Sequence, residues 1–270
     1  MKKLKICFSY TFLAGSLLFG LSGCESMANF IGYDSQTLNA SAAKNYAEVV
    51  SGAKNQGTLD VKSNTAKRVK IVFDRLVPYA DAANKTGIQF NWQLNVIRSD
   101  ELNAWAMPGG KMVVYTGIVE KLKLTDAELA AVIGHEMTHA LMEHSKKAAG
   151  QQALGNMALE IGGSVVAAKT NIKVDNINLT KKILSQYGLN LPFSRLQESQ
   201  ADSGGVRLMA QAGYDPHAAI TLWEKMENYG GKSSLTLLST HPSNANRLKA
   251  IEKQLPEVMP LYEASQAKNK

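Results

Sequence analysis

Residues 125–141 read TDAELAAVIGHEMTHAL, and this stretch decides the fold around it. Thr125 is followed by Glu128, which is the capping-box pattern at the start of a helix. Asp126 and Glu128 also place negative charge at the positive end of the helix dipole. Apolar residues then recur at helical spacing. The pattern predicts a capped, buried helix over residues 126–148.

Two histidines of this helix, His135 and His139, lie one turn apart. Side chains four residues apart share a helix face, so both imidazoles can reach one Zn²⁺ at about 2.0–2.1 Å. Glu136 follows the first histidine and can act as a general base toward a water that the metal activates. The alternative is a pair of partly buried histidines beside a solvated glutamate. The helical context favours the metal site.

A catalytic zinc needs a third protein ligand. On an uninterrupted helix, His144 lies about 140° around the axis from His139 and faces elsewhere. His217 is expected at the surface. Glu198 is the strongest candidate because it shares a helix face with Asp202, whose carboxylate can then orient a ligand histidine. A solvated acidic pair is the alternative. The full set of downstream candidates is Glu143, His144, Glu160, Glu198 and His217.

The N-terminal residues 1–23 have the layout of a secretory signal peptide, with a basic start and an apolar run over residues 6–21. The sequence LSGC that ends at Cys24 resembles the bacterial lipobox, which implies lipidation of Cys24 after cleavage. An uncleaved membrane anchor is the alternative, but the run is shorter than the roughly 20 residues of a span. We therefore expect a signal peptide, a lipidated tether over residues 24–40 and one domain over residues 41–270.

Glu rather than Asp stands at position 25. By resemblance to lipoprotein sorting in Gram-negative bacteria, this favours the periplasmic face of the outer membrane over the inner membrane. We expect the lipid on Cys24 to be the contact with the membrane.

Composition excludes several classes of protein. The chain has 45% apolar and 20% charged residues, which is globular composition. Three of its 30 basic residues would leave with the signal peptide, so 27 would face 23 acidic ones. That excess is too small to indicate nucleic-acid binding. The two cysteines, Cys7 and Cys24, would be removed and lipidated respectively, which excludes a disulfide scaffold and a catalytic cysteine.

The fold class expected is α+β and mostly helical, with a small sheet. Residues 89–97 alternate apolar and polar side chains, as a strand does. Residues 103–115 indicate a strand, a Pro-Gly-Gly turn and a second strand. Residues 155–168 suggest a packed helix, with a mobile flap over a cleft as the alternative. Further helices are expected at 41–54, 62–85, 151–170, 175–187, 195–212, 215–228 and 243–255.

Four blocks of sequence occur in one order: NAWAMPGG at 103–110, HEMTH at 135–139, ESQAD at 198–202 and STHPS at 239–243. Together they resemble the zinc metallopeptidase family of HtpX, Oma and the CAAX prenyl endopeptidases, over about residues 60–255. Within it, the chain is similar to the periplasmic lipoprotein branch that includes LoiP. Trp105 departs from the family's usual phenylalanine, which would alter a pocket but not the chemistry.

The resemblance implies a minimal zincin-like metallopeptidase domain with an HExxH active-site helix. It implies one Zn²⁺ per chain, bound by His135, His139 and Glu198, with Glu136 as the base. Asp202 would orient a histidine, and His241 would stabilise the oxyanion, with Arg247 as the second candidate. Pro242 keeps His241 extended and outside a helix. An edge strand would hold the substrate backbone through Asn103, Ala104, Trp105 and Ala106.

The function implied is a metalloendopeptidase that cleaves unfolded or misfolded envelope proteins in protein quality control. One alternative is an envelope chaperone or adaptor with a vestigial zinc site, and the intact Glu136 argues against it. Another is a lipoprotein in which zinc only stabilises the fold, and an open fourth position on the metal would argue against that. For His241, the alternative is a loop-stabilising role.

Overall fold

The computed structural model describes residues 34–150, 192–229, 236–241 and 246–268. The expected signal peptide, Cys24, Glu160 and the helices expected at 151–170 and 175–187 lie outside these residues. Among the described helices, none is both long and apolar enough to cross a bilayer.

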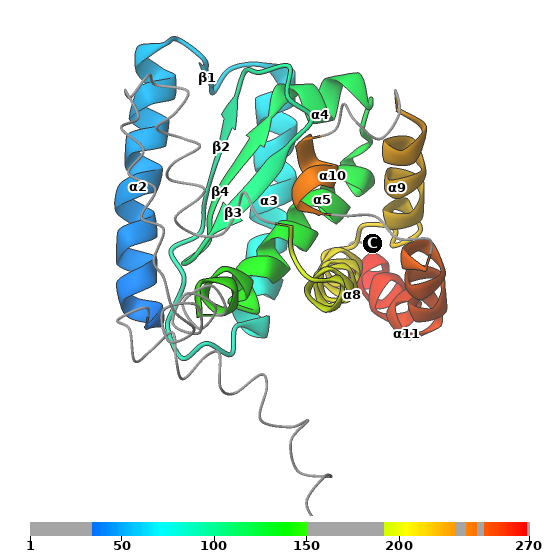
Figure 1. Ribbon diagram of the computed structural model, residues 1–270. Coiled ribbons are helices and arrows are strands. Elements are labelled where there is room, and N and C mark those ends of the chain that lie inside the picture. The colour runs from blue at the N-terminus through cyan, green and yellow to red at the C-terminus, as the bar shows by residue number, and fades with distance from the viewer. Residues whose placement is uncertain (1–33, 151–191, 230–235, 242–245, 269–270) are drawn as a thin grey trace, which may run out of the picture.

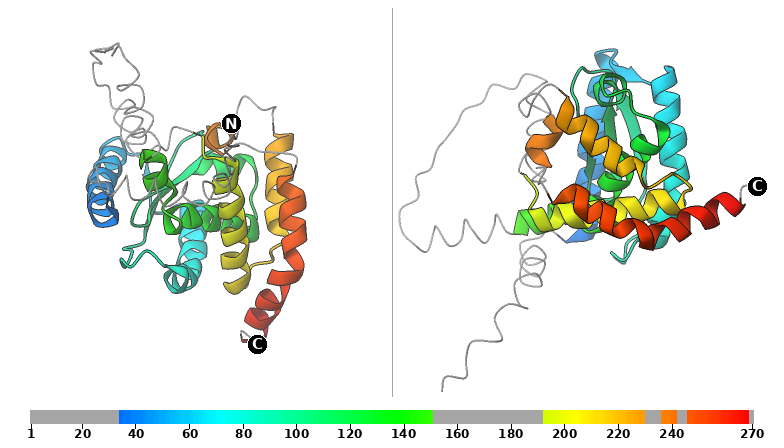
Figure 2. Two further views of the ribbon diagram at one scale, coloured as in Figure 1. Left: turned by 60° about the horizontal axis from the view of Figure 1, so that its bottom comes forward. Right: turned by 90° about the vertical axis from the view of Figure 1, so that its right-hand side faces the viewer.

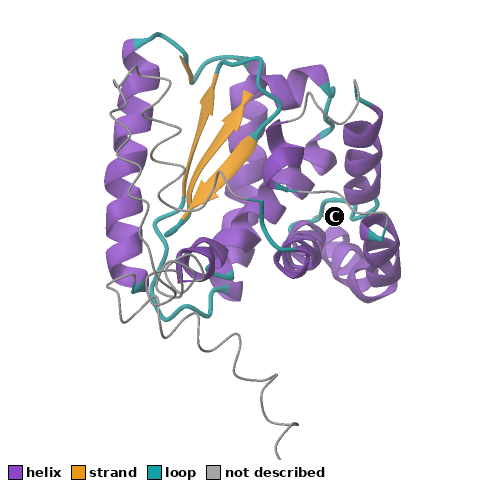
Figure 3. Cartoon of the chain, viewed as in Figure 1, coloured by secondary structure: helices purple, strands orange, loops and turns teal. Residues whose placement is uncertain are grey.

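A four-stranded sheet stands in the order β1-β2-β4-β3 (Figures 1 and 3). Strand β4 pairs parallel with β2 and antiparallel with β3, which leaves β3 at an edge of the described sheet. The tight turn between β3 and β4 uses Gly109 and Gly110, whose φ angles are 74° and 78°. The strands are Leu59–Asp60 (β1), Gln93–Ile97 (β2), Ala104–Met107 (β3) and Lys111–Tyr115 (β4).

Helices cover both faces of the sheet (Figure 1). Helix α2 (Ser35–Asn55) packs on the face that presents Trp105 and Val113. Helices α3 (Asn64–Ala83) and α5 (Asp126–Leu141) pack on the face that presents Ala104, Ala106 and Met112. Because successive side chains of a strand point to opposite faces, β2, β3 and β4 each contribute to both apolar clusters.

The second half of the chain adds helices beside α5. Helix α8 (Arg195–Gln211) packs on α5, and α11 (Arg247–Lys268) runs alongside α8 (Figure 2). The remaining helices are α4 (Thr116–Lys121), α9 (Ala218–Asn228) and α10 (Thr236–Thr240). The expectation of an α+β, mostly helical fold with a small sheet and an HExxH helix is confirmed.

The helix expected over residues 126–148 is interrupted, which corrects the sequence prediction. Helix α5 ends at Leu141, and Met142 and Glu143 form a turn in which Glu143 takes the left-handed φ of 51°. Helical structure resumes at residues 144–150.

Other boundaries also differ. Helix α2 begins at Ser35, so the last residues of the expected tether over 24–40 are helical rather than a tether. Strand β2 begins at Gln93, α9 begins three residues later than expected, and α11 covers Arg247–Lys268 rather than 243–255. Strand β1 and helices α4 and α10 were not predicted, because elements this short carry too little periodicity.

Candidate metal centre and active site

The start of α5 is held by the capping box that the sequence predicts. The Thr125 backbone N–H donates to Glu128 Oε2 at 2.8 Å, and the Glu128 N–H donates to Thr125 Oγ1 at 3.2 Å. Lys225 Nζ, on α9, lies 2.6 Å from the same Glu128 carboxylate, and Thr221 Oγ1 donates to it at 2.9 Å. The buried Glu128 therefore joins the start of α5 to α9 and fixes the direction in which α5 enters the core.

Helices α5 and α8 cross in close contact at glycines. A Cβ on Gly205 would stand 2.7 Å from the His135 backbone nitrogen, and one on Gly134 would stand 3.0 Å from the Gly205 carbonyl oxygen. A Cβ on Gly204 would meet Thr138 at 2.4 Å. No side chain fits between the helices at this crossing. The close approach brings the α8 carboxylates within reach of the α5 histidines.

Three buried side chains converge on one point. Nε2 of His135 lies 3.0 Å from Nε2 of His139. The Glu198 oxygens lie 3.6 Å from His135 Nε2 and 3.4 Å from His139 Nε2. A tetrahedral Zn²⁺ with ligands at about 2.0–2.1 Å separates its ligand atoms by about 3.3 Å. The two imidazole nitrogens and the carboxylate therefore fit zinc in donor type and in spacing.

Behind this point, the carboxylates form a buried ion-pair network. Asp202 Oδ1 lies 3.0 Å from His135 Nδ1, on the side of the imidazole away from His139. Arg247 donates through Nε and Nη2 to the two Asp202 oxygens at 2.6 and 2.7 Å, and through Nη2 to Glu198 Oε2 at 2.9 Å. Its guanidinium also stacks on the Trp223 ring, 3.4 Å from the centroid. The structure thus places Arg247 against the carboxylates, where it balances their charge.

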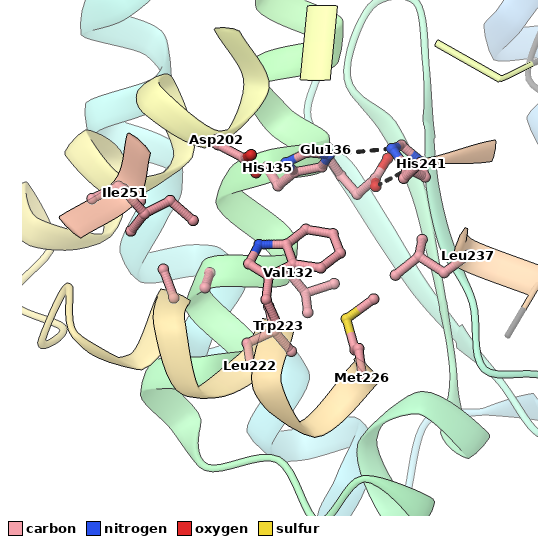
Figure 4. Close-up of a pocket in the computed structure, with 13 residues that line it drawn as sticks. Val132, His135, Glu136, Asp202, Leu222, Trp223, Met226, Leu237, His241 and Ile251 are labelled. Atoms are coloured by element: carbon pink, nitrogen blue, oxygen red, sulfur yellow. Dashed lines mark hydrogen bonds and ion pairs between the residues drawn. The ribbon is translucent and has the colours of Figure 1, made fainter. Parts of the chain in front are cut away.

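Glu136 and His241 face each other beside the ligand atoms (Figure 4). His241 Nε2 lies 3.4 Å from Glu136 Oε1, and its Nδ1 lies 2.9 Å from Glu198 Oε1 and 3.2 Å from His135 Nε2. One ligand atom from each of His135, His139, Glu198 and His241 lies within 4.8 Å of the others. His241 therefore offers a fourth donor to the same point. It directly follows α10, as the restriction before Pro242 predicts, and its N–H donates to the Leu237 carbonyl at 2.8 Å.

Burial and charge shift the titration of these two groups. Burial raises the pKa of Glu136, although His241 and His135 favour its ionised form. Burial disfavours the cation of His241, but the Glu136 and Glu198 carboxylates outweigh it and raise the pKa of that imidazole. A carboxyl group whose pKa is raised toward neutral pH is suited to accept and release a proton.

The predicted edge strand lies next to Glu136. Ala104, Trp105 and Ala106 belong to β3, and Asn103 directly precedes it. The Ala106 backbone N–H donates to the Glu136 carboxylate. Trp105 points to the other face of the sheet, where its Nε1–H donates to the Tyr115 hydroxyl at 3.3 Å. The backbone of β3, rather than the Trp105 ring, therefore faces the site.

Comparison with known proteins decides the family. The pattern of "Peptidase family M48" matches residues 63–255, which is more than half of the chain. The chain belongs to peptidase family M48. The predicted resemblance to this family of metallopeptidases is thereby confirmed.

This M48 peptidase chain is similar to several curated proteins. It is 40% identical over 176 residues to the mitochondrial metalloendopeptidase OMA1 of Schizosaccharomyces pombe, covering 64% of this chain and 50% of that protein. It is 29% identical over 257 residues to the metalloprotease LoiP of Escherichia coli, covering 90% and 95%. It is 27% identical over 191 residues to the β-barrel assembly-enhancing protease of E. coli, covering 69% and 38%. The chain spans half or less of the OMA1 proteins that it matches first.

The M48 site also contains a contact that sequence reasoning excluded. His144 does not face away from His139: its Nδ1 lies 2.9 Å from His139 Nδ1. The prediction assumes an uninterrupted helix, but the turn at Met142 and Glu143 interrupts it and brings residue 144 back toward His139. The left-handed conformation of Glu143 carried no signal in the sequence. The exposed position of His217, by contrast, is as predicted.

In this M48 domain, a small cavity adjoins the candidate metal site formed by His135, His139 and Glu198 (Figure 4). It measures about 20 Å³ and reaches His135, Glu136 and His241. Its other walls are mostly apolar and come from α5, α8, α9, α10 and α11; they include Val132, Leu222, Trp223, Met226, Leu237 and Ile251.

Proposed function

We propose that this chain is a zinc-dependent endopeptidase that binds one Zn²⁺ through His135, His139 and Glu198. The observation that carries the proposal is the meeting of three buried side chains beside the carboxylate of Glu136: the two histidine Nε2 atoms lie 3.0 Å apart, and the two Glu198 oxygens lie 3.4 and 3.6 Å from them. Burial and the hydrogen bonds of Asp202 and Arg247 hold this arrangement in place. Membership of peptidase family M48 supports the same chemistry.

When bound, zinc supplies a Lewis acid that polarises the scissile carbonyl and makes water a stronger acid. Glu136 then takes the proton of the attacking water and delivers it to the leaving amine. Asp202 accepts a hydrogen bond from Nδ1–H of His135, which leaves Nε2 unprotonated and directed at the metal. Burial opposes the ionised form of Glu198, but its contacts with the His139 and His241 imidazoles outweigh burial and hold its pKa below the usual range. Arg247 Nη2 also donates to Glu198 Oε2 at 2.9 Å.

We propose that β3 aligns the substrate. A strand at a sheet edge can pair with an extended peptide through its backbone, and the Ala106 N–H already reaches the catalytic carboxylate. Recognition of the backbone admits many sequences but requires an unfolded chain. Unfolded or misfolded envelope proteins are therefore the proposed substrates. The cleavage rate of one substrate in its native and its denatured form tests this, and equal rates would contradict it.

For location, we propose a lipid anchor on Cys24 at the periplasmic face of the outer membrane. The lipobox-like LSGC sequence and Glu25 support it. The similarity to two proteins of E. coli, one named for β-barrel assembly, agrees with an envelope location. Cys24→Ala should abolish labelling with palmitate and release the protein from sedimented membranes. Labelled palmitate that persists on this variant would refute the anchor.

The test of the activity compares wild-type protein with Glu136→Gln on casein, with and without a chelator. Wild-type protein should cleave, chelation should stop cleavage, and added zinc should restore it. Glu136→Gln should retain zinc and fold but lose cleavage, because the amide cannot take a proton. Activity of Glu136→Gln equal to wild type would refute the mechanism. A wild-type protein that binds zinc, folds and cleaves nothing would favour the chaperone or adaptor alternative.

A further inference from the structure

We infer that His144 is a positioning residue that holds His139 in the orientation and tautomer required for metal binding, an inference that rests on the proposed zinc site. His144 is completely buried, with 0% of its surface exposed. Its Nδ1 faces Nδ1 of His139 at 2.9 Å, the distance of a hydrogen bond. Two imidazole nitrogens at this distance share one proton, and the rest of the site determines which ring carries it.

The direction of this hydrogen bond follows from the ligand geometry. Nε2 of His139 is the atom that meets His135 and Glu198, so a bound metal requires that nitrogen to be unprotonated. The proton of a neutral His139 then lies on Nδ1, and Nδ1 of His144 is the acceptor. The second nitrogen of His144, Nε2, carries its own proton and donates to Gln200 Oε1 at 3.1 Å. Two aligned hydrogen bonds thus run from His139 through His144 to Gln200.

Helix α8 fixes His144 at two places. The Gln197 side chain donates through Nε2 to the His144 backbone carbonyl at 3.3 Å, while Gln200 accepts from the His144 ring. Gln197 is itself fixed, because its Oε1 accepts the Ser194 N–H at 2.9 Å in the α8 capping box. Since α8 also carries Glu198, one helix supplies a candidate metal ligand and the groups that orient another.

The Phe193 side chain also covers one face of the His139 ring. The Phe193 ring lies 4.0 Å from the His139 ring, between centroids, and is tilted by 32°. With Phe193 on its face and His144 at its distal nitrogen, the imidazole cannot rotate without losing a buried hydrogen bond. The two candidate ligand histidines therefore differ in support: the Asp202 carboxylate holds His135, and a neutral imidazole holds His139.

The experiment measures zinc affinity of the full chain by competition with a chromogenic chelator. His144→Leu removes the acceptor for Nδ1–H of His139 and should weaken zinc binding by about 10- to 100-fold, the usual effect of losing such a partner. His144→Asn keeps an amide oxygen near the position of Nδ1 and should recover most of the affinity. His217→Leu removes an exposed histidine outside the site and should leave affinity unchanged. Gln200→Leu leaves His144 in place and should weaken binding less than His144→Leu does.

A purely structural role for His144 predicts a different pattern. His144→Leu and His144→Asn would then both lower the melting temperature of the zinc-free protein, while the zinc affinity of the folded protein stayed at the wild-type value. That result would overturn the inference. If His144→Leu does not fold, the inference stands or falls on Gln200→Leu, which must weaken zinc binding. A wild-type chain that binds no zinc would refute the proposed function itself, which distinguishes the two failures.

Discussion

Gly205 of α8 lies so close to His135 of α5 that a Cβ on the glycine would stand 2.7 Å from the His135 backbone nitrogen. The helix that carries Glu198 and the helix that carries the HExxH sequence therefore touch backbone to backbone. The separations between Glu198 and the two histidines depend on this contact, because both helices are rigid over the few residues between the crossing and the ligands.

Gly205→Ala should therefore damage the metal site from outside it. The added methyl group must push α8 away from α5, which we expect to cost about 1–3 kcal/mol of stability and to reduce zinc content. Gly52→Ala in α2 is the matched control, because a Cβ there meets nothing within 4 Å and alanine favours a helix. Thermal unfolding and metal analysis of both variants check this. If Gly205→Ala kept the zinc content and stability of wild type, the helix crossing could accommodate a methyl group and the prediction would be wrong.

The third metal ligand can be tested directly. Glu198→Ala removes the carboxylate that lies 3.4 Å from His139 Nε2, and should leave a folded chain without stoichiometric zinc. His135→Ala and His139→Ala should have the same effect, whereas His217→Ala should keep one zinc per chain. Elemental analysis of the purified proteins gives the ratio. One zinc per folded chain in Glu198→Ala would exclude Glu198 as a ligand.

Replacement of His241 distinguishes its two possible roles, as an oxyanion donor or as a residue that stabilises the loop. As an oxyanion donor, it should be dispensable for folding and zinc binding, and His241→Phe should lower kcat by about 10²–10³ with little change in KM. A loop-stabilising histidine would lower stability and leave the specific activity of the folded fraction intact. Its Nδ1 also lies among the ligand atoms, so a rise in kcat would show that this histidine closes the metal's fourth position. Steady-state kinetics of zinc-loaded protein distinguish these results.

Acid should weaken the capped start of α5 through Glu128. Burial opposes its ionisation, but hydrogen bonds from Lys225 and Thr125 outweigh burial and hold its pKa below the ordinary value of 4.5. A carboxyl group whose pKa is lower in the folded than in the unfolded state stabilises the fold at pH values above its unfolded-state pKa. This stabilisation is lost as the pH falls through the folded-state pKa. The unfolding free energy of wild-type protein should therefore decline below about pH 4.5.

Glu128→Gln should decline less steeply over the same range, because its amide does not titrate and can still complete the capping box. Glu48→Gln, at an exposed position of α2, is the control and should follow wild type. Denaturant unfolding at a series of pH values measures the difference between the variants. Parallel curves for Glu128→Gln and wild type would contradict the assignment.

The N-terminal half of the site could be predicted from sequence because its signals are local. The capping box of Thr125 and Glu128 and the one-turn spacing of His135 and His139 lie within one helix. The Pro-Gly-Gly turn lies between adjacent strands, so neighbouring residues again contain the whole signal. Glu198 and Asp202 could be proposed from their spacing, but their distance from the histidines depends on how α5 and α8 cross, which the spacing of one helix does not contain.

By itself, the sequence determined the α+β class, the HExxH helix, the hairpin and the family. These depend on side-chain periodicity, caps and turns, which act over a few residues. Only the tertiary structure decided that Arg247 binds Asp202 and Glu198, that His241 stands among the ligand atoms, and that His144 supports His139. Those contacts join residues far apart in the chain or follow a left-handed turn at Glu143. They arise from the packing of whole helices, and no local pattern of side chains encodes such an arrangement.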